Sequence, residues 1–309
     1  DMIAQVVRHP ANDDEVFVSD LTLLSGGAAA NTAYACAKIG LSTAFIGKLG
    51  CHDTFGDKIL NDFKEVNVTT KLIKYSEHHG TGSAYIALNE KGDRRIYAHS
   101  GAANYLSKED LLEKELINTK IIFLSSLKNI EPFIEAATIG RNNKIPVILN
   151  PGMLISEQGL KNIKKLLEKI DILILSQNEY ATLFDIEQCD LNEDLIQEKS
   201  STLFNLGIQV IITTLGKKGA FLLTSSRAEL LPPVKLSSLI DTTGAGDAFS
   251  AGFIYGFIRN INLKFEHLKN NVEIGNFVAG NCIQELGARN GIPNREDLNF
   301  FLNALNKKI

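Results

Sequence analysis

The most informative run of this sequence is Asp241-Thr242-Thr243-Gly244-Ala245-Gly246-Asp247-Ala248-Phe249. Three small residues precede Asp247, and an apolar helical stretch follows from Ala248 to Phe257. Small residues leave backbone N–H groups accessible, and the start of a helix favours negative charge, so this order is typical of an anion site. A carboxylate in the first helical turn can accept a proton from a hydroxyl while the turn holds a phosphoryl group. The run therefore predicts phosphoryl transfer to an alcohol.

The same run also has a purely structural interpretation. Gly-Ala-Gly can serve tight packing alone, and aspartate is an ordinary residue near a helix N-terminus. Two better-known phosphate motifs are excluded, because no Gly-Lys-Ser/Thr follows and the Gly-x-Gly-x-x-Gly spacing is absent.

Length and composition narrow the class of protein. A chain of 309 residues fits one large domain with a substantial core. The net charge of −4 and the lack of a dense basic run argue against nucleic-acid binding. Four scattered cysteines without Cys-x-x-Cys spacing favour reduced thiols in a cytoplasmic protein over a zinc site or disulfide framework. No secretory signal and no run of 18 apolar residues is present, so we expect no membrane span.

Short apolar runs alternate with amphipathic stretches along the chain. The predicted strands are Thr43–Gly47, Ile121–Leu124, Val147–Leu149, Ile172–Leu175, Val210–Thr213 and Ala220–Leu223. The predicted helices are Ala29–Ile39, Asp57–Glu65, Lys108–Leu116, Glu131–Asn142, Gly159–Lys169, Asn192–Leu206, Ala248–Arg259, Phe265–Glu285 and Arg295–Leu305. Continuous apolar strands that alternate with helices predict an α/β fold, a mostly parallel sheet with helices on both faces.

Two stretches depart from this pattern. Glu15–Leu24 alternates polar and apolar residues, and Ser83–Tyr97 reads as two strands joined by the turn residues Asn89–Asp93. We interpret them as a small β-sheet lid, with segments at about 12–24 and 81–100, on a single domain that spans residues 1–309; an ordinary edge hairpin is the alternative. The exposed edges of such a lid could be covered by a second copy, giving a homodimer.

A second glycine-rich run, Ser25–Ala33, also leads into a helix. Its glycines allow the backbone to approach a ligand closely, and Asn31 offers both a donor and an acceptor to a hydroxylated substrate. Taken alone, the run could be a simple turn and cap.

The two runs together give the chain a strong resemblance to the ribokinase-like (PfkB) family of carbohydrate and nucleoside kinases. The resemblance covers essentially the whole chain. It rests on Gly26-Gly27 with Asn31, Ile46–Gly50 through Phe55-Gly56, Gly101–Asn104, Asn178-Glu179, Thr214–Gly219, Asp241–Asp247, Gly287-Ala288 and Pro293.

The resemblance implies a role for each matching residue. It implies that Asp247 is the catalytic base and that Gly244, Ala245 and Gly246 form the anion hole. The implied sugar-site residues are Asp1, Gly26, Gly27, Asn31 and Asn104. The implied nucleotide-site residues are Asn178, Thr214, Gly216, Gly219 and Asn276. The implied cofactors are ATP and Mg²⁺, with Glu179 as a candidate magnesium ligand through water, and K⁺, with Asp241 and Thr243 as candidate ligands.

Three features depart from the family pattern. Ala181 stands where the family's Asn-x-x-Glu motif has its acid. Gly291 stands where a small hydroxyl often completes the cation site. The family also has a strand of the central sheet ahead of Asp1, so we expect a trimmed start rather than a fold without that strand.

We therefore expect an ATP-dependent kinase that phosphorylates a primary hydroxyl of a small sugar, of the ribokinase or fructokinase type. A ribonucleoside kinase that acts on the 5′-hydroxyl is the first alternative, since it uses the same chemistry. The nucleobase of such a substrate would need an apolar wall, for which Phe45, Tyr85 and Tyr97 are candidates. A non-catalytic sugar- or nucleotide-binding regulator is the second alternative, and the intact Asp247 argues against it.

Overall fold

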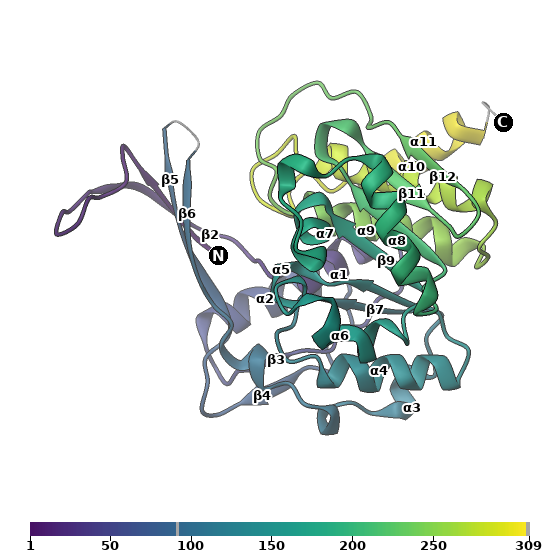
Figure 1. The fold of residues 1–309 in the computed structure, drawn as a ribbon. Coiled ribbons are helices and arrows are strands. Elements are labelled where there is room, and N and C mark those ends of the chain that lie inside the picture. The colour runs from purple at the N-terminus through teal and green to yellow at the C-terminus, as the bar shows by residue number, and fades with distance from the viewer. Residues whose placement is uncertain (91–92, 307–309) are drawn as a thin grey trace.

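The computed structural model describes residues 1–90 and 93–306, and its main body is a six-stranded sheet (Figure 1). The strand order is β12-β11-β10-β9-β8-β7. The strands are β7 (Ile122–Ser125), β8 (Val147–Asn150), β9 (Ile172–Ser176), β10 (Val210–Thr214), β11 (Ala220–Leu223) and β12 (Ala228–Leu231). Neighbours from β7 to β10 are parallel, whereas β11 and β12 pair antiparallel. The predicted, mostly parallel sheet is therefore confirmed.

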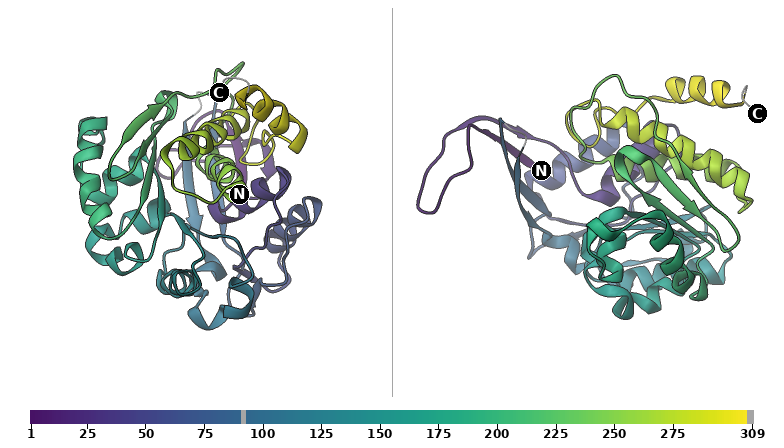
Figure 2. Two further views of the ribbon diagram at one scale, coloured as in Figure 1. Left: turned by 90° about the vertical axis from the view of Figure 1, so that its right-hand side faces the viewer. Right: turned by 45° about the horizontal axis from the view of Figure 1, so that its top comes forward.

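Both faces of this sheet are covered by helices, as predicted (Figure 2). Side chains of β9 point alternately to the two faces of the sheet. Leu173 belongs to the hydrophobic cluster on one face, and Ile172 and Ile174 belong to the cluster on the other. One face packs on α4 (Glu131–Asn142), α6 (Gly159–Leu167), α7 (Gln177–Phe184) and α8 (Glu193–Asn205). The other packs on α1 (Ala28–Lys38), α9 (Ala245–Arg259), α10 (Phe265–Cys282) and α11 (Arg295–Asn306). Across the described residues, no helix is long and apolar enough to cross a membrane.

A second sheet projects from this body, on the left of Figure 1, and confirms the predicted β-sheet lid. Its order is β2-β1-β5-β6, from β1 (Met2–Val6), β2 (Val18–Leu23), β5 (Ser83–Asn89) and β6 (Arg94–His99). The sequence analysis missed β1, although β1 joins the two predicted lid segments by pairing antiparallel with β2 and parallel with β5. Two residues of the predicted turn, 91 and 92, lie outside the described residues.

Two predicted elements were wrong. Thr43–Gly47 contributes only an isolated bridge between Ala44 and Thr69, and the strand that follows, β3 (Lys48–Gly50), pairs instead with β4 (Lys74–Ser76). The predicted helix Lys108–Leu116 is split, because the backbone of Leu111 and Leu112 is extended. It becomes a 3₁₀ turn at Lys108–Asp110 and the short α3 (Glu113–Leu116). The remaining helices are α2 (Thr54–Glu65) and α5 (Gly152–Ser156).

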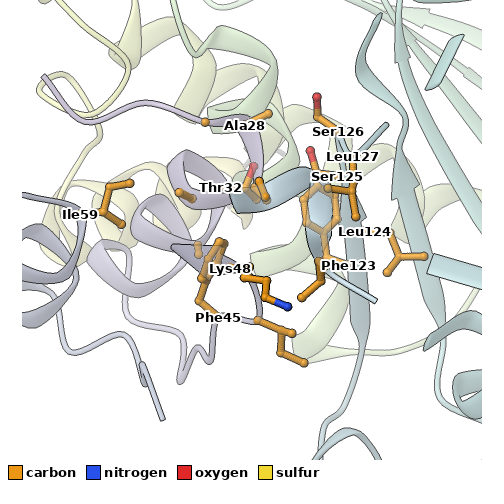
Figure 3. Close-up of a pocket in the computed structure, with 18 of the residues that line it drawn as sticks. Ala28, Thr32, Phe45, Lys48, Ile59, Phe123, Leu124, Ser125, Ser126 and Leu127 are labelled. Atoms are coloured by element: carbon orange, nitrogen blue, oxygen red, sulfur yellow. The ribbon is translucent and has the colours of Figure 1, made fainter. Parts of the chain in front are cut away.

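A cavity of about 1110 Å³ lies between α1 and the edge strand β7. Figure 3 shows Thr32 and Phe45 on one side of it and Phe123 and Leu124 on the other. The cavity runs from the Gly26-Gly27 loop to the side of β7 that has no paired strand in the described residues.

Helices α9 and α10 approach each other closely because glycines face each other at their crossing. A Cβ atom added to Gly252 would lie 2.7 Å from the carbonyl oxygen of Ile274 and 2.9 Å from the Cα atom of Gly275. A Cβ atom on Gly275 would lie 3.0 Å from the carbonyl oxygen of Phe249. These contacts are with backbone atoms, which cannot rotate away, so the crossing depends on the missing side chains.

We expect Gly252→Ala to lower the free energy of unfolding by about 1–3 kcal/mol, since overpacking against backbone forces the two helices apart. Urea denaturation measures this change. Gly246→Ala in the first turn of the same helix is the matched control, because its Cβ atom would meet nothing within 4 Å. The control should change the free energy of unfolding by less than about 1 kcal/mol. Equal effects of the two substitutions would contradict the close crossing.

Candidate active site

The turn before α9 has the geometry of an anion site. Gly244 caps the helix with φ 75°, a left-handed conformation that favours glycine. A Cβ atom there would lie 2.7 Å from the Cα atom of Ala288, whereas one on Gly246 would meet nothing within 4 Å. The turn is thus packed from behind and open in front. The Ala245 N–H donates to the Thr242 carbonyl over 3.3 Å, so the N–H groups of Gly246 and Asp247 are the ones that this helix start can offer to a ligand.

Asp241 holds this turn in shape. Its buried carboxylate accepts hydrogen bonds from the backbone N–H of Thr243 (2.9 Å), the hydroxyl of Thr243 (2.7 Å) and the backbone N–H of Gly287 (2.9 Å). The two candidate cation ligands are therefore in direct contact. Through these bonds the turn is tied to the Gly287-Ala288 segment, which packs behind Gly244.

Asp247 lies in the first turn of α9 and contacts the sugar loop, by which we mean the glycine-rich run Ser25–Ala33 that leads into α1. The side-chain amide of Asn31 donates a hydrogen bond of 2.9 Å to Oδ2 of Asp247, and the Thr32 hydroxyl donates to the Asp247 carbonyl (3.4 Å). These bonds join α1 to α9. Two runs that are far apart in the sequence thus meet at the candidate base.

The environment of Asp247 raises the pKa of its carboxyl from 3.8 to about 7. Desolvation by burial is the main cause, and the negative charge of Glu179 adds to it. The hydrogen bond from Asn31 and the positive charge of Arg289 lower the pKa and offset part of this rise. A carboxylate with a pKa near neutrality is well suited to general base catalysis at physiological pH.

Four of the five predicted sugar residues line one cavity, and the fifth, Asn31, contacts Asp247. A Cβ atom on Gly26 would lie 2.5 Å from Cγ of Asp1, so the Asp1 carboxylate rests directly on this glycine. Asp1, Gly26, Gly27 and Asn104 all line the cavity of Figure 3, and Asn31 lies beside it against Asp247. The Gly26-Gly27 loop and the 3₁₀ turn Gly101–Tyr105 therefore line the same cavity.

The predicted nucleotide residues fall into two groups. Asn178 lies in the first turn of α7, which follows β9 directly, and Thr214 ends the neighbouring β10. Both therefore lie at the carboxyl edge of the sheet, where α/β proteins bind ligands. Gly219 and Asn276 instead contact the segment after β12. The Asn276 amide donates to the Pro232 carbonyl (3.0 Å), and a Cβ atom on Gly219 would lie 2.8 Å from Pro232. Gly216 has φ 55° in the turn between β10 and β11.

Glu179 has a structural partner as well as a place near the base. Its carboxylate accepts a hydrogen bond of 2.7 Å from the backbone N–H of Ser176 and so caps α7. Burial raises the pKa of its carboxyl. Ala181 is buried in the same helix and offers no ligand. No group of three or more His, Cys, Asp or Glu side chains in the described part of the chain is arranged to hold a metal ion. A magnesium ion held mainly by phosphate oxygens and water would need few protein ligands.

The sequence analysis missed Arg289 and Asp62. Arg289 is 7% exposed and donates to Asn31 and to Asp62 over 3.0 and 3.1 Å. One signal in the sequence was an arginine directly after Gly287-Ala288, within a segment assigned to the site. Nothing in the sequence marked Asp62 as its partner, because 227 positions separate the two residues.

Comparison with known proteins identifies the family. Residues 1–295 match the family described as pfkB family carbohydrate kinase. The ribokinase of Staphylococcus aureus (strain COL) is 30% identical over 276 residues, which cover 89% of this chain and 86% of the relative.

Solved structures agree in fold. The Arabidopsis thaliana ribokinase complexed with ribose and ATP is 24% identical with a TM-score of 0.84, and the alignment covers 97% of this chain and 95% of that one. The nucleoside kinase of Methanocaldococcus jannaschii is 21% identical with a TM-score of 0.81, over 98% and 94%. With a family match across nearly the whole chain and a shared fold, this protein belongs to the pfkB family of carbohydrate kinases.

Proposed function

We propose that the protein transfers the terminal phosphoryl group of ATP to a primary hydroxyl of a small sugar. The observation that carries this proposal is the contact between the two glycine-rich runs. Asp247 lies beside the open turn at Gly246, and the sugar-loop residue Asn31 donates a hydrogen bond to it. This contact supports the proposal because it brings together the residues proposed as base, anion site and acceptor loop.

In the proposed reaction Asp247 takes the proton of the acceptor hydroxyl. The N–H groups of the Gly244–Gly246 turn stabilise the charge of the transferred phosphoryl group, which is the main demand of this chemistry. The nucleotide would lie along Asn178, Thr214, Gly216, Gly219 and Asn276. Bound Mg²⁺ would neutralise phosphate charge, with Glu179 contacting it through water. Asp241 and Thr243 are the proposed K⁺ ligands, next to the turn that they order.

A ribonucleoside kinase is the second candidate. The cavity of about 1110 Å³ is large for a pentose, since pockets of 300–1,000 Å³ commonly hold whole drug-sized ligands. Of the aromatic candidates for a base-binding wall, Phe45 lines this cavity, whereas Tyr85 and Tyr97 are exposed on the lid. Much of the cavity extends toward β7, away from the Gly26-Gly27 loop. Its volume alone therefore does not require a nucleoside, and the small sugar stays the first candidate.

An ATP-consumption screen tests the proposal. The acceptors are pentoses, hexoses, their phosphates, sugar acids and nucleosides, each with Mg²⁺ and with or without K⁺. We expect a sugar to give the highest kcat/KM. A nucleoside as the best acceptor would replace the first candidate by the second. Binding of sugar and ATP without turnover would establish a regulator.

We expect Asp247→Asn to lower kcat by about 100-fold or more, because the amide cannot accept the proton and general base catalysis typically contributes this much. The KM for the acceptor should change less, since the size of the side chain is kept. Steady-state kinetics with the best acceptor of the screen measure both. Near-normal kcat would remove Asp247 from the role of base.

The same variant has a folding control with a definite sign. The raised pKa of Asp247 means that ionising it costs stability in the folded state, so the parent protein should lose stability between about pH 4 and pH 7 and little more above that. The amide that replaces the carboxyl does not titrate. Asp247→Asn should therefore be more stable than the parent at pH 8, by up to about 4 kcal/mol, and the difference should shrink at pH 5. A variant that is less stable at pH 8 would contradict the buried carboxylate.

We expect Gly246→Val to abolish phosphoryl transfer while the acceptor still binds. The valine side chain would project into the open space in front of the turn, where the phosphoryl group is proposed to lie. Calorimetry with the acceptor alone, beside the activity assay, separates the two effects. Retained turnover would show that the turn has a structural role only.

We also propose that the lid sheet, with segments at about 12–24 and 81–100, covers the acceptor within a single 1–309 domain, and that it pairs two copies of the chain. Tyr85 lies opposite Tyr97 on one face of the lid, and they are 54% and 68% exposed. Leu21 is 57% exposed on β2. Apolar side chains this exposed favour a partner that covers them.

Four free cysteines agree with a cytoplasmic location.

Sedimentation velocity should therefore detect a dimer that Tyr97→Lys converts to a monomer, because a buried lysine at the interface would lose its hydration. Ile117→Lys is the matched control, since Ile117 is a similarly exposed apolar residue on the main body at 44%. A monomeric parent protein, or equal dissociation by both variants, would exclude the lid as the interface.

A further inference from the structure

A buried ion pair lies behind the sugar loop. The Arg289 guanidinium donates to Oδ2 of Asp62 on α2 (3.1 Å) and, through Nε, to Oδ1 of Asn31 on α1 (3.0 Å). Asn31 in turn donates through Nδ2 to Oδ2 of Asp247 (2.9 Å). Asp62, Arg289, Asn31 and Asp247 thus form one continuous hydrogen-bonded chain that ends at the candidate base.

The direction of the hydrogen bonds in this network is set by which groups can donate and which can accept. A side-chain amide has one end that donates and one that accepts, and it can turn over to exchange them. Arginine has donors only, so Arg289 can face only the oxygen of the Asn31 amide. The amide nitrogen is then left to point at Asp247. Asn31 must therefore donate to the Asp247 carboxylate rather than present its oxygen to it.

Arg289 itself is held firmly. Its guanidinium carbon lies 5.1 Å from the ring centre of Tyr34 and 5.7 Å from that of Phe63. Asp62 is fixed by a second partner, Lys58, at 2.6 Å. A planar guanidinium between two rings and a carboxylate has little freedom, and a lysine could not reproduce these contacts.

We infer that Arg289 is a positioning residue for phosphoryl transfer, which acts through Asn31 on the Asp247 carboxylate. The inference rests on the proposed role of Asp247 as the base. It assigns a catalytic consequence to an ion pair that neither touches the acceptor nor lies in either glycine-rich run.

Charge supports the same assignment. The positive charge of Arg289 lowers the pKa of Asp247, while burial and Glu179 on α7 raise it. The other groups that face Asp247 are Asn31 on α1, which is neutral, and Cys282 on α10, whose thiol pKa is raised to about 12 by burial. Arg289 is thus the positive charge that opposes Glu179 at this carboxylate.

The test compares Arg289→Gln with the parent protein, using ATP and the best acceptor of the screen. Without the positive charge of Arg289 the pKa of Asp247 should rise. The acid limb of the plot of kcat/KM against pH should therefore move to higher pH by about half a unit or more. The value of kcat at pH 7 should fall by about 10- to 100-fold, because the base is misplaced. The KM for ATP should stay within about twofold, since the nucleotide site is untouched.

Three further variants keep the test decisive. Asp62→Asn combined with Arg289→Gln removes both buried charges, so it avoids an unpaired Asp62 and should show the same displaced acid limb. Arg289→Lys keeps the charge but reaches only one partner, so kcat should fall while the acid limb stays in place. Arg259→Gln is the matched control. Arg259 also contacts a tyrosine, Tyr255, but lies about 18 Å along α9 from Asp247, and its loss should change neither quantity.

An acid limb that is unmoved in the folded Arg289→Gln or double variant would overturn the inference, and so would an equal shift in Arg259→Gln. Full kcat in Arg289→Lys would overturn it as well. Asp247→Asn separates this failure from that of the proposed function. If Asp247→Asn is inactive and the Arg289 variants leave the profile unchanged, the base assignment stands and only the role of Arg289 is refuted.

Discussion

The burial of the Asp247 carboxylate is the constraint to which the rest of the site responds. Taking a carboxylate out of water costs free energy, and here burial raises its pKa to about 7. The cost is offset by the Asn31 amide and by the charge of Arg289, which are supplied by α1 and by the segment after α10. These partners can meet Asp247 only because α1 and α9 pack on the same face of the sheet. A stable fold and the proposed role of Asp247 as a base are therefore opposing demands on one contact.

Much of the fold could be predicted because its strands and helices carry strong periodic signals. The apolar runs of β8, β9 and β10 are buried on both faces and read as strands without ambiguity, and α4 begins and ends where its pattern does. The errors fall where local sequence does not decide the outcome. Thr43–Gly47 is apolar enough for a strand but has no neighbouring strand to pair with beyond one bridge. Met2–Val6 is short, and its strand depends on pairing with both β2 and β5.

The candidate site divides in the same way. Gly244 and Asp247 could be predicted because backbone conformation and helix position are local properties, written in adjacent residues. The contacts between Asp247 and Asn31, and between Arg289 and Asp62, join positions that only the packed fold brings together. No spacing along the chain signals them, since the partners lie on α1, α2 and two C-terminal segments. Chemistry that depends on a pair of side chains from distant elements needs the structure.

The loop between β2 and α1 has a consequence for evolution in this family. Strand β2 ends at Leu23 and α1 begins at Ala28, so the four residues between them join the projecting sheet to the helix that carries Asn31. Those four residues include Gly26 and Gly27, which line the cavity proposed to bind the acceptor. A change that re-shapes this loop for a new acceptor also re-aims the attached sheet. If the loop has its proposed role, a change of acceptor preference should therefore require compensating changes in β1 and β5 as well as substitutions in the loop.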